Sequence, residues 1–130
     1  MTTTVLLVDD NQTFLYSVRM FLRMLPNMEV VGEAHDGLAA LKQADELQPD
    51  LALLDIALPE MNGLEVARKL QALPRPPKIV FLSIHDSPDY RAAASSLGAD
   101  GYVSKADFVT ELFPIMRRMA GAESDFGPPH

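Results

Sequence analysis

The chain has 130 residues, about the length of one domain. Its 18 aspartates and glutamates outnumber its 11 lysines and arginines, and the resulting net charge of −7 argues against a broad surface that binds the phosphate backbone of nucleic acids. The sequence has no cysteine, which excludes disulfides, thiol nucleophiles and cysteine-ligated metal clusters.

Short β-rich apolar runs alternate along the chain with longer stretches in which apolar residues recur at helical spacing. The predicted strands are residues 5–8, 29–34, 51–54, 78–82 and 101–104. The predicted helices are residues 14–25, 37–47, 63–73, 88–97 and 107–120. Strands that alternate with helices indicate an α/β fold, with a doubly wound parallel sheet covered by helices on both faces.

The first two helices are predicted from apolar stripes that would face the sheet. The stripe of the first helix consists of Phe14, Val18, Phe21, Leu22 and Leu25. Pro26 ends this helix. In the second helix we expect Leu38, Leu41 and Leu47 to face inward.

The other three helices have recognisable ends or inner faces. The third presents Val66, Ala67, Leu70 and Leu73 and ends before the proline-rich residues 74–77. Ser87 as N-cap and Pro88 in the first turn open the fourth, which is rich in alanine, has a weak apolar face and ends at Gly98. The fifth uses Phe108, Leu112, Phe113 and Met116.

A membrane or secretory segment is not expected. The apolar runs are far shorter than the roughly 20 residues that a spanning helix needs. The first basic residue is Arg19, so the charged start and the apolar stretch of a secretory signal are both missing. With an apolar fraction of 48%, the composition indicates a globular domain, which we expect to be cytoplasmic.

Polar residues follow four of the five predicted strands. They are Asp9 with Asp10, then Asp55, Ser83 and Lys105. The carboxyl ends of parallel strands lie at one edge of an open α/β sheet, and ligands bind at that edge. The pattern therefore predicts that these residues converge on one site.

Each of these residues alone has a simpler explanation. An aspartate after a strand most often caps the next helix, but Asn11 can cap the first helix, which leaves Asp9 and Asp10 unexplained. Ser83 alone could be a buried hydroxyl bonded to the backbone, and Lys105 alone could be a solvated charge. The joint pattern favours a common site.

Three carboxylates at one sheet edge repel one another unless positive charge enters the site. A divalent cation such as Mg²⁺ or Mn²⁺ is the simple remedy, and Lys105 would add a second positive charge. A carboxylate whose surroundings are neutralised in this way can act as the nucleophile in phosphoryl transfer, and Asp55 on the central strand is best placed. The sequence has no glycine-rich phosphate loop, so a bound nucleotide is not indicated.

Four motifs in chain order resemble the receiver domain of two-component response regulators. They are Leu6-Leu7-Val8-Asp9-Asp10, Asp55-Ile56-Ala57-Leu58-Pro59 with Gly63, Phe81-Leu82-Ser83, and Gly98-Ala99-Asp100-Gly101-Tyr102-Val103-Ser104-Lys105. The resemblance implies a flavodoxin-like fold with five helices and strand order 2-1-3-4-5. It implies a receiver domain at residues 1–120, followed at residues 121–130 by a flexible tail or the start of a linker.

The resemblance gives the acidic residues their roles. Asp55 would be the phosphoacceptor. Asp9, Asp10 and Asp55, together with the backbone carbonyl of Ala57, would hold Mg²⁺.

Three further residues would respond to the phosphoryl group, again by resemblance. Ser83 would hydrogen-bond to it, and Lys105 would pair first with Asp55 and then with the phosphate. Tyr102 would be the switch aromatic that turns inward when Ser83 moves. For Tyr102, the simpler explanation of a half-exposed strand aromatic stays open.

As a receiver, the chain would take a phosphoryl group from a sensor histidine kinase and switch an output domain or a downstream protein, in transcriptional regulation. The expected partner surface is the fourth helix, the fifth strand and the fifth helix. The chain would not be an enzyme in the usual sense, although it would catalyse its own phosphorylation and slow dephosphorylation. Residues 30–37 and 82–86 resemble receivers that are joined to a helix-turn-helix output domain. The resemblance also allows a homodimer formed on phosphorylation.

Two other functions stay open. An aspartate-nucleophile phosphohydrolase of small molecules generally needs a second acid two positions after the nucleophile, where this chain has Ala57. A receiver-like binding module that works without phosphorylation would be expected to lose Asp10, Asp55 or Lys105, and all three are present.

Three residues depart from the family pattern. Ala57 has no side chain that could reach a phosphoryl group, which leaves the phosphorylation and dephosphorylation rates open. Ile84 stands where a small residue is frequent. Pro114 cannot donate to the carbonyl of Thr110 and should kink or shorten the last helix.

Overall fold

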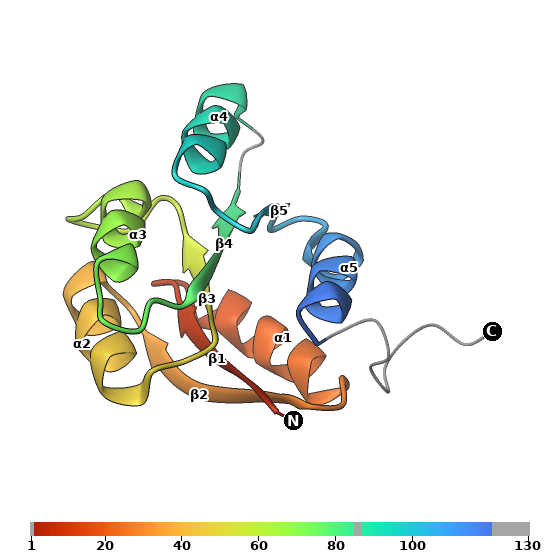
Figure 1. The fold of residues 1–130 in the computed structure, drawn as a ribbon. Coiled ribbons are helices and arrows are strands. Elements are labelled where there is room, and N and C mark those ends of the chain that lie inside the picture. Colours follow the sequence, from red (N-terminus) through yellow and green to blue (C-terminus); the bar gives the residue numbers. More distant parts are fainter. Residues whose placement is uncertain (1, 85–86, 121–130) are drawn as a thin grey trace.

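The computed structural model describes residues 2–84 and 87–120 of the chain (Figure 1). One parallel sheet has the strand order β2-β1-β3-β4-β5, which confirms the predicted order. The strands are β1 (Thr3–Val8), β2 (Met28–Ala34), β3 (Leu51–Asp55), β4 (Lys78–Ser83) and β5 (Gly101–Ser104). Asp55 and Ser83, which were expected to follow their strands, are the last residues of β3 and β4.

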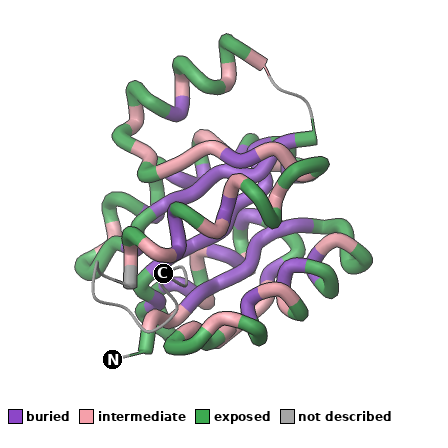
Figure 2. Tube along the Cα trace, turned by 90° about the vertical axis from the view of Figure 1, so that its right-hand side faces the viewer, coloured by how far each residue is buried: buried purple, intermediate pink, exposed green. Residues whose placement is uncertain are grey.

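In the part of the chain that the structure describes, five helices cover the two faces of the sheet (Figure 1). They are α1 (Gln12–Arg23), α2 (Gly37–Leu47), α3 (Gly63–Gln71), α4 (Pro88–Ser96) and α5 (Phe108–Ala120). Because successive side chains of a strand point to opposite faces, β1 contributes to two cores. Val5 and Leu7 pack with α1 and α5, whereas Leu6 and Val8 pack with α2, α3 and α4. Figure 2 shows the buried residues along the central strands.

The prediction for the inner face of α2 is wrong for Leu38 and Leu47, whereas Leu41 packs against the core. Leu38 is 70% exposed and Leu47 is 45% exposed, while Leu41 is half-buried. The residues that α2 buries are small: Gly37, Ala40 and Ala44. The reason is the close approach of α2 to α3, since a Cβ atom at Gly37 would lie 2.9 Å from Cγ2 of Val66. A leucine on that face would not fit.

The other helices agree more closely with the sequence pattern. In α1, Val18 and Leu22 of the predicted stripe are fully buried, together with Leu15, which the stripe did not include. In α4 the one buried residue among those described is Ala94, which confirms the weak apolar face. The side chain of Ser87 caps α4 as predicted, since it accepts a hydrogen bond from the backbone of Tyr90 at 3.3 Å.

Helix α5 is not shortened by its proline. It runs from Phe108 to Ala120 with Pro114 inside it, so the expected shortening is wrong, and the expected kink stays a prediction. Pro114 is exposed, and α5 packs against the sheet through Leu112, Ile115 and Met116. The predicted tail at residues 121–130 lies outside the described residues. Among the helices that the structure describes, none is long and apolar enough to span a bilayer.

Candidate functional site

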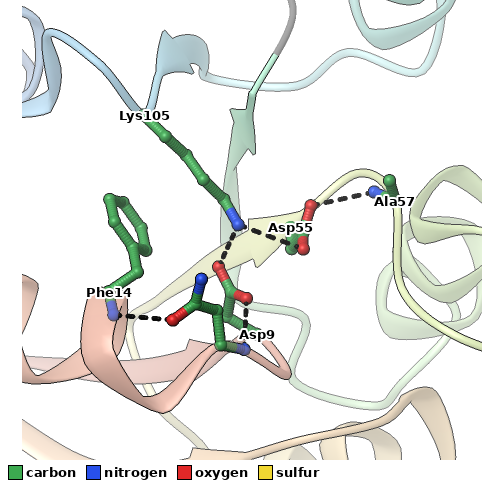
Figure 3. A network of polar contacts seen from close by, with 6 residues as sticks. Asp9, Phe14, Asp55, Ala57 and Lys105 are labelled. Atoms are coloured by element: carbon green, nitrogen blue, oxygen red, sulfur yellow. Dashed lines mark hydrogen bonds and ion pairs between the residues drawn. The ribbon is translucent and has the colours of Figure 1, made fainter.

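Three aspartates and a lysine meet at the carboxyl edge of the sheet. Figure 3 shows two of the aspartates, Asp9 and Asp55, around the ammonium of Lys105. Asp9 and Asp10 directly follow β1, Asp55 ends β3, and Lys105 directly follows β5. One carboxylate oxygen from each aspartate lies within 4.8 Å of the others. The parallel arrangement accounts for this convergence, because all of these strands end at the same edge.

Lys105 bridges two of the carboxylates. Its Nζ atom lies 2.6 Å from Oδ2 of Asp9 and 3.2 Å from Oδ2 of Asp55. Only 9% of the lysine side chain is exposed, so water screens these two ion pairs little. The ammonium therefore partly neutralises the acidic site, and its closer partner is Asp9.

Asp9 is fully buried, with an exposed fraction of 0%. Its Oδ1 accepts a hydrogen bond from the backbone N–H of Asn11 at 2.9 Å. Apart from the Lys105 ammonium, Oδ2 has no polar partner within the described part of the chain. Burial raises the pKa of the Asp9 carboxyl, and the charge of Asp55 adds to this, while Lys105 and the Asn11 N–H oppose it. The site thus holds a buried anion that is short of partners.

Asp55 is held in place by the loop that follows it. Its Oδ1 accepts a hydrogen bond from the backbone N–H of Ala57 at 2.9 Å. The loop then returns to the strand, where the N–H of Gly63 donates to the carbonyl of Ile56 at 3.0 Å. A Cβ atom at Gly63 would lie 2.5 Å from the carbonyl oxygen of Asp55, so this return requires glycine.

The donor atoms of this site suit a hard divalent cation. Such ions bind oxygen ligands, and here the carboxylates of Asp9, Asp10 and Asp55 face one another. Asp10 is exposed, whereas Asp9 contributes a buried oxygen whose one polar partner among the described residues is the Lys105 ammonium. These three residues could therefore hold Mg²⁺ or Mn²⁺. The ligand role of the Ala57 carbonyl stays a prediction.

The two expected switch residues lie on β4 and β5. Ser83 is buried, and its carbonyl accepts a hydrogen bond from the backbone N–H of Lys105 at 2.8 Å. Tyr102 is half-buried, and Cζ of Arg91 on α4 lies 4.6 Å from the centre of its ring. The backbone thus joins Ser83 to Lys105, and Tyr102 joins β5 to α4. The switching roles of both residues stay predictions.

One residue at the site was not anticipated as functional. Phe14, in the first turn of α1, places the centre of its ring 4.8 Å from Nζ of Lys105. The sequence pattern assigned Phe14 only to the apolar stripe of α1. A contact between an aromatic face and a cation from another strand end has no signature in local sequence.

Comparison with known proteins adds a family match. The family described as "Response regulator receiver domain" matches residues 5–115. The nitrate/nitrite response regulator protein NarL of Escherichia coli K12 is 36% identical over 120 residues, which cover 92% of this chain and 56% of that protein. The transcriptional regulatory protein DegU of Brevibacillus brevis is 37% identical over 115 residues, 86% of this chain and 49% of that protein. The chain therefore spans about half the length of these relatives.

Solved structures agree with the sequence matches. The signal receiver domain of the putative response regulator NarL from Mycobacterium tuberculosis superposes with a TM-score of 0.83 at 34% identity, covering 92% of this chain and 96% of that one. A LuxR-family two-component response regulator from Aurantimonas has a TM-score of 0.85 at 27% identity, covering 95% and 89%. The resemblance drawn from the four motifs and the flavodoxin-like fold are thereby confirmed.

Proposed function

The chain belongs to the response regulator receiver domain family, and from that premise we propose that it accepts a phosphoryl group on Asp55, assisted by a divalent cation. The observation that supports this most is the shared ammonium: Nζ of Lys105 lies 3.2 Å from Oδ2 of Asp55 and 2.6 Å from Oδ2 of Asp9. The Lys105 ammonium therefore lies beside the carboxylate that would carry the phosphoryl group, where it could pair with the phosphoryl oxygens.

In the proposed transfer, a carboxylate oxygen of Asp55 attacks the phosphorus of a phosphohistidine on a sensor histidine kinase. The new O–P bond forms as the P–N bond breaks, and the bonding electron pair stays on the imidazole nitrogen, which takes up a proton. The N–H of Ala57 holds Oδ1 of Asp55 and so orients the carboxylate for attack. Mg²⁺, when bound by Asp9, Asp10 and Asp55, supplies charge neutralisation for the phosphoryl oxygens.

After transfer, Lys105 would leave Asp9 and pair with the phosphoryl group, and the Ser83 hydroxyl would donate to it. The phosphoryl group adds about −1.5 to −2 charge and three acceptor oxygens, which favours closure of the loops after β4 and β5. The hydrogen bond from the Lys105 N–H to the Ser83 carbonyl would make these loops move together. A coupling of about 1–3 kcal/mol is enough to change the affinity for a partner.

The proposed output surface is formed by α4, β5 and α5. Tyr102 and Arg91 line a cavity of about 230 Å³ between α4 and β5, which gives the tyrosine ring space to move. Phosphorylation is expected to change amide exchange on these elements, and unchanged exchange there would count against this surface.

A hydrolase acting on small molecules is not supported. Ala57 has no group that could protonate a leaving group, and a cavity of about 440 Å³ lies at the opposite edge of the sheet, beside Thr3, Asp50 and Lys78. A module that works without phosphorylation would have no use for the cluster of Asp9, Asp10, Asp55 and Lys105.

The proposed partners of the whole protein are supported by its relatives, two of which are named as a response regulator and a transcriptional regulatory protein. We propose that residues 1–120 form a cytoplasmic receiver that acts with a helix-turn-helix output domain in transcriptional regulation. Homodimerisation on phosphorylation is part of this proposal.

The test is intact-mass spectrometry after incubation with phosphoramidate, with Mg²⁺ or with a chelator. Wild type should gain one phosphoryl group in Mg²⁺ and none in chelator, and Asp55→Asn should gain none. Asp45→Asn, which removes an exposed acid of α2 away from the site, is the charge-matched control and should behave as wild type. Equal labelling of Asp55→Asn and wild type would contradict the proposal.

A further inference from the structure

We propose that Phe14 is a positioning residue for Lys105: its aromatic face holds the ammonium at the acidic site and so strengthens the pairing of Lys105 with a phosphoryl group on Asp55. The consequence for phosphoryl binding rests on the proposed function. The contact between the Phe14 ring and the Lys105 ammonium is independent of that proposed function.

The geometry of the contact carries the first step. Nζ of Lys105 lies 4.8 Å from the centre of the Phe14 ring, within the roughly 6 Å over which a cation is attracted to an aromatic face. Figure 3 shows the ring on one side of the ammonium and Asp55 on the other. The lysine side chain is largely buried. The ring therefore covers part of the ammonium that water would otherwise solvate.

The second step is that Phe14 is fixed to the acidic loop. Its backbone N–H donates to Oδ1 of Asn11 at 3.0 Å, and the N–H of Asn11 donates to Oδ1 of Asp9 at 2.9 Å. The N-cap of α1 therefore sets the position of the Phe14 backbone relative to the Asp9 carboxylate. The ring thus projects from backbone that is tied to the loop carrying Asp9.

The third step is that the ring is supported from the side of α5. Phe108, three residues after Lys105, packs edge to face on Phe14 with ring centres 5.2 Å apart and planes at 74°. Phe21 packs on the same Phe108 at 5.9 Å. Phe21 thus shares the aromatic packing, while the ring recorded over the ammonium is that of Phe14. This difference provides a matched control.

The ring should matter most in the phosphorylated state. In the structure, Asp9 is the closest partner of the ammonium, at 2.6 Å. When Asp9 binds a cation, it is no longer available to pair with Lys105. The ammonium then has two partners, the phosphoryl group and the face of the Phe14 ring. An aliphatic residue at position 14 would preserve apolar packing but would lose the attraction for the ammonium.

The experiment uses protein labelled with ¹³C-lysine, in which the ε-methylene signal of Lys105 is assigned by its loss in Lys105→Arg. A ring current should shift this signal upfield in wild type, in Phe14→Tyr and in Phe21→Leu. The shift should vanish in Phe14→Leu, and in Phe14→Met, which provides a second non-aromatic variant should the first not fold. The measurement needs neither metal nor phosphodonor.

A second measurement is the affinity for beryllofluoride, a phosphoryl analogue, in Mg²⁺. Phe14→Leu and Phe14→Met should bind about threefold to tenfold more weakly than wild type. Phe14→Tyr and Phe21→Leu should stay within about twofold.

Three results would overturn the inference. The Lys105 signal could be unshifted in wild type, it could be insensitive to the loss of the ring, or Phe21→Leu could weaken beryllofluoride binding as much as Phe14→Leu. Failure of the proposed function would look different, because wild type and every variant would then fail to bind beryllofluoride.

Discussion

The negative charge of Asp9 is unfavourable, because its carboxylate is fully buried. Burial raises its pKa above the ordinary value of 3.8, so the folded protein binds more protons than the unfolded chain between these two pKa values. Stability therefore falls as the pH rises through that window, and the ionised carboxylate destabilises the fold at neutral pH. The same unfavourable charge is what a bound cation would relieve.

Asp9→Asn should therefore raise the free energy of unfolding at pH 7 in chelator, because it removes a charge that burial and Asp55 make unfavourable and keeps an oxygen for the Asn11 N–H. The gain should disappear at acid pH, where Asp9 is protonated in both states, and Mg²⁺ should no longer stabilise the variant. Urea unfolding checks this, with Asp45→Asn as the exposed control. A variant less stable than wild type at pH 7 would contradict the account of Asp9.

Gly63 makes a second prediction at the residue scale. Gly63→Ala should destabilise the protein by about 1–3 kcal/mol, because the new Cβ would meet the backbone of Asp55 and Ile56 at 2.5–2.6 Å. Gly37→Ala is the matched control, since Gly37 also begins a helix but faces the side chains of Met61 and Val66. Urea unfolding should show the smaller loss for Gly37→Ala, and equal losses would show that the backbone contact is not decisive.

The acidic residues and the lysine could be located from sequence because each lies at the end of a strand. The closer pairing of Lys105 with Asp9 than with Asp55 could not, since it depends on side-chain distances of a few tenths of an ångström. Phe14 was missed for a related reason. Its helical spacing is explained by core packing alone, and the ammonium that it contacts comes from a distant part of the chain.

At the scale of elements, α2 shows how helical spacing can mislead. The sequence of α2 has one face with leucines and another with small residues, and hydrophobicity alone favours burial of the leucine face. The observed packing buries Gly37, Ala40 and Ala44, because the close distance to α3 selects for small volume. The leucines at positions 38 and 47 are left exposed. Sequence alone does not supply the distance between two helices that are adjacent only in space.

Helix α5 gives the prediction at this scale. Pro114 lies inside α5 on the exposed side and leaves the carbonyl of Thr110 without its helical donor. Pro114→Ala should stabilise the protein by about 1–3 kcal/mol. Thr110→Ala, an exposed change in the same helix, should alter stability by less than about 0.5 kcal/mol. Thermal unfolding checks both, and a destabilised Pro114→Ala would mean that the proline is matched to the packing of α5.

For the whole molecule, the alternation of strands and helices was enough to predict a doubly wound parallel sheet, because right-handed crossovers leave few other arrangements. The order of the strands came from the resemblance of four motifs, since periodicity does not say which strands are neighbours. That order places the ends of β1, β3, β4 and β5 side by side. The candidate site is therefore a property of the topology as much as of its residues.

The central claim is that this edge of the sheet makes Asp55, and neither of the neighbouring aspartates, the phosphoacceptor. The most direct measurement is to phosphorylate the protein with phosphoramidate and Mg²⁺, reduce it with borohydride, which converts an aspartyl phosphate to homoserine, and map the peptides by mass spectrometry. The account predicts homoserine at position 55 alone. Homoserine at position 9 or 10, or none at any position, would contradict it.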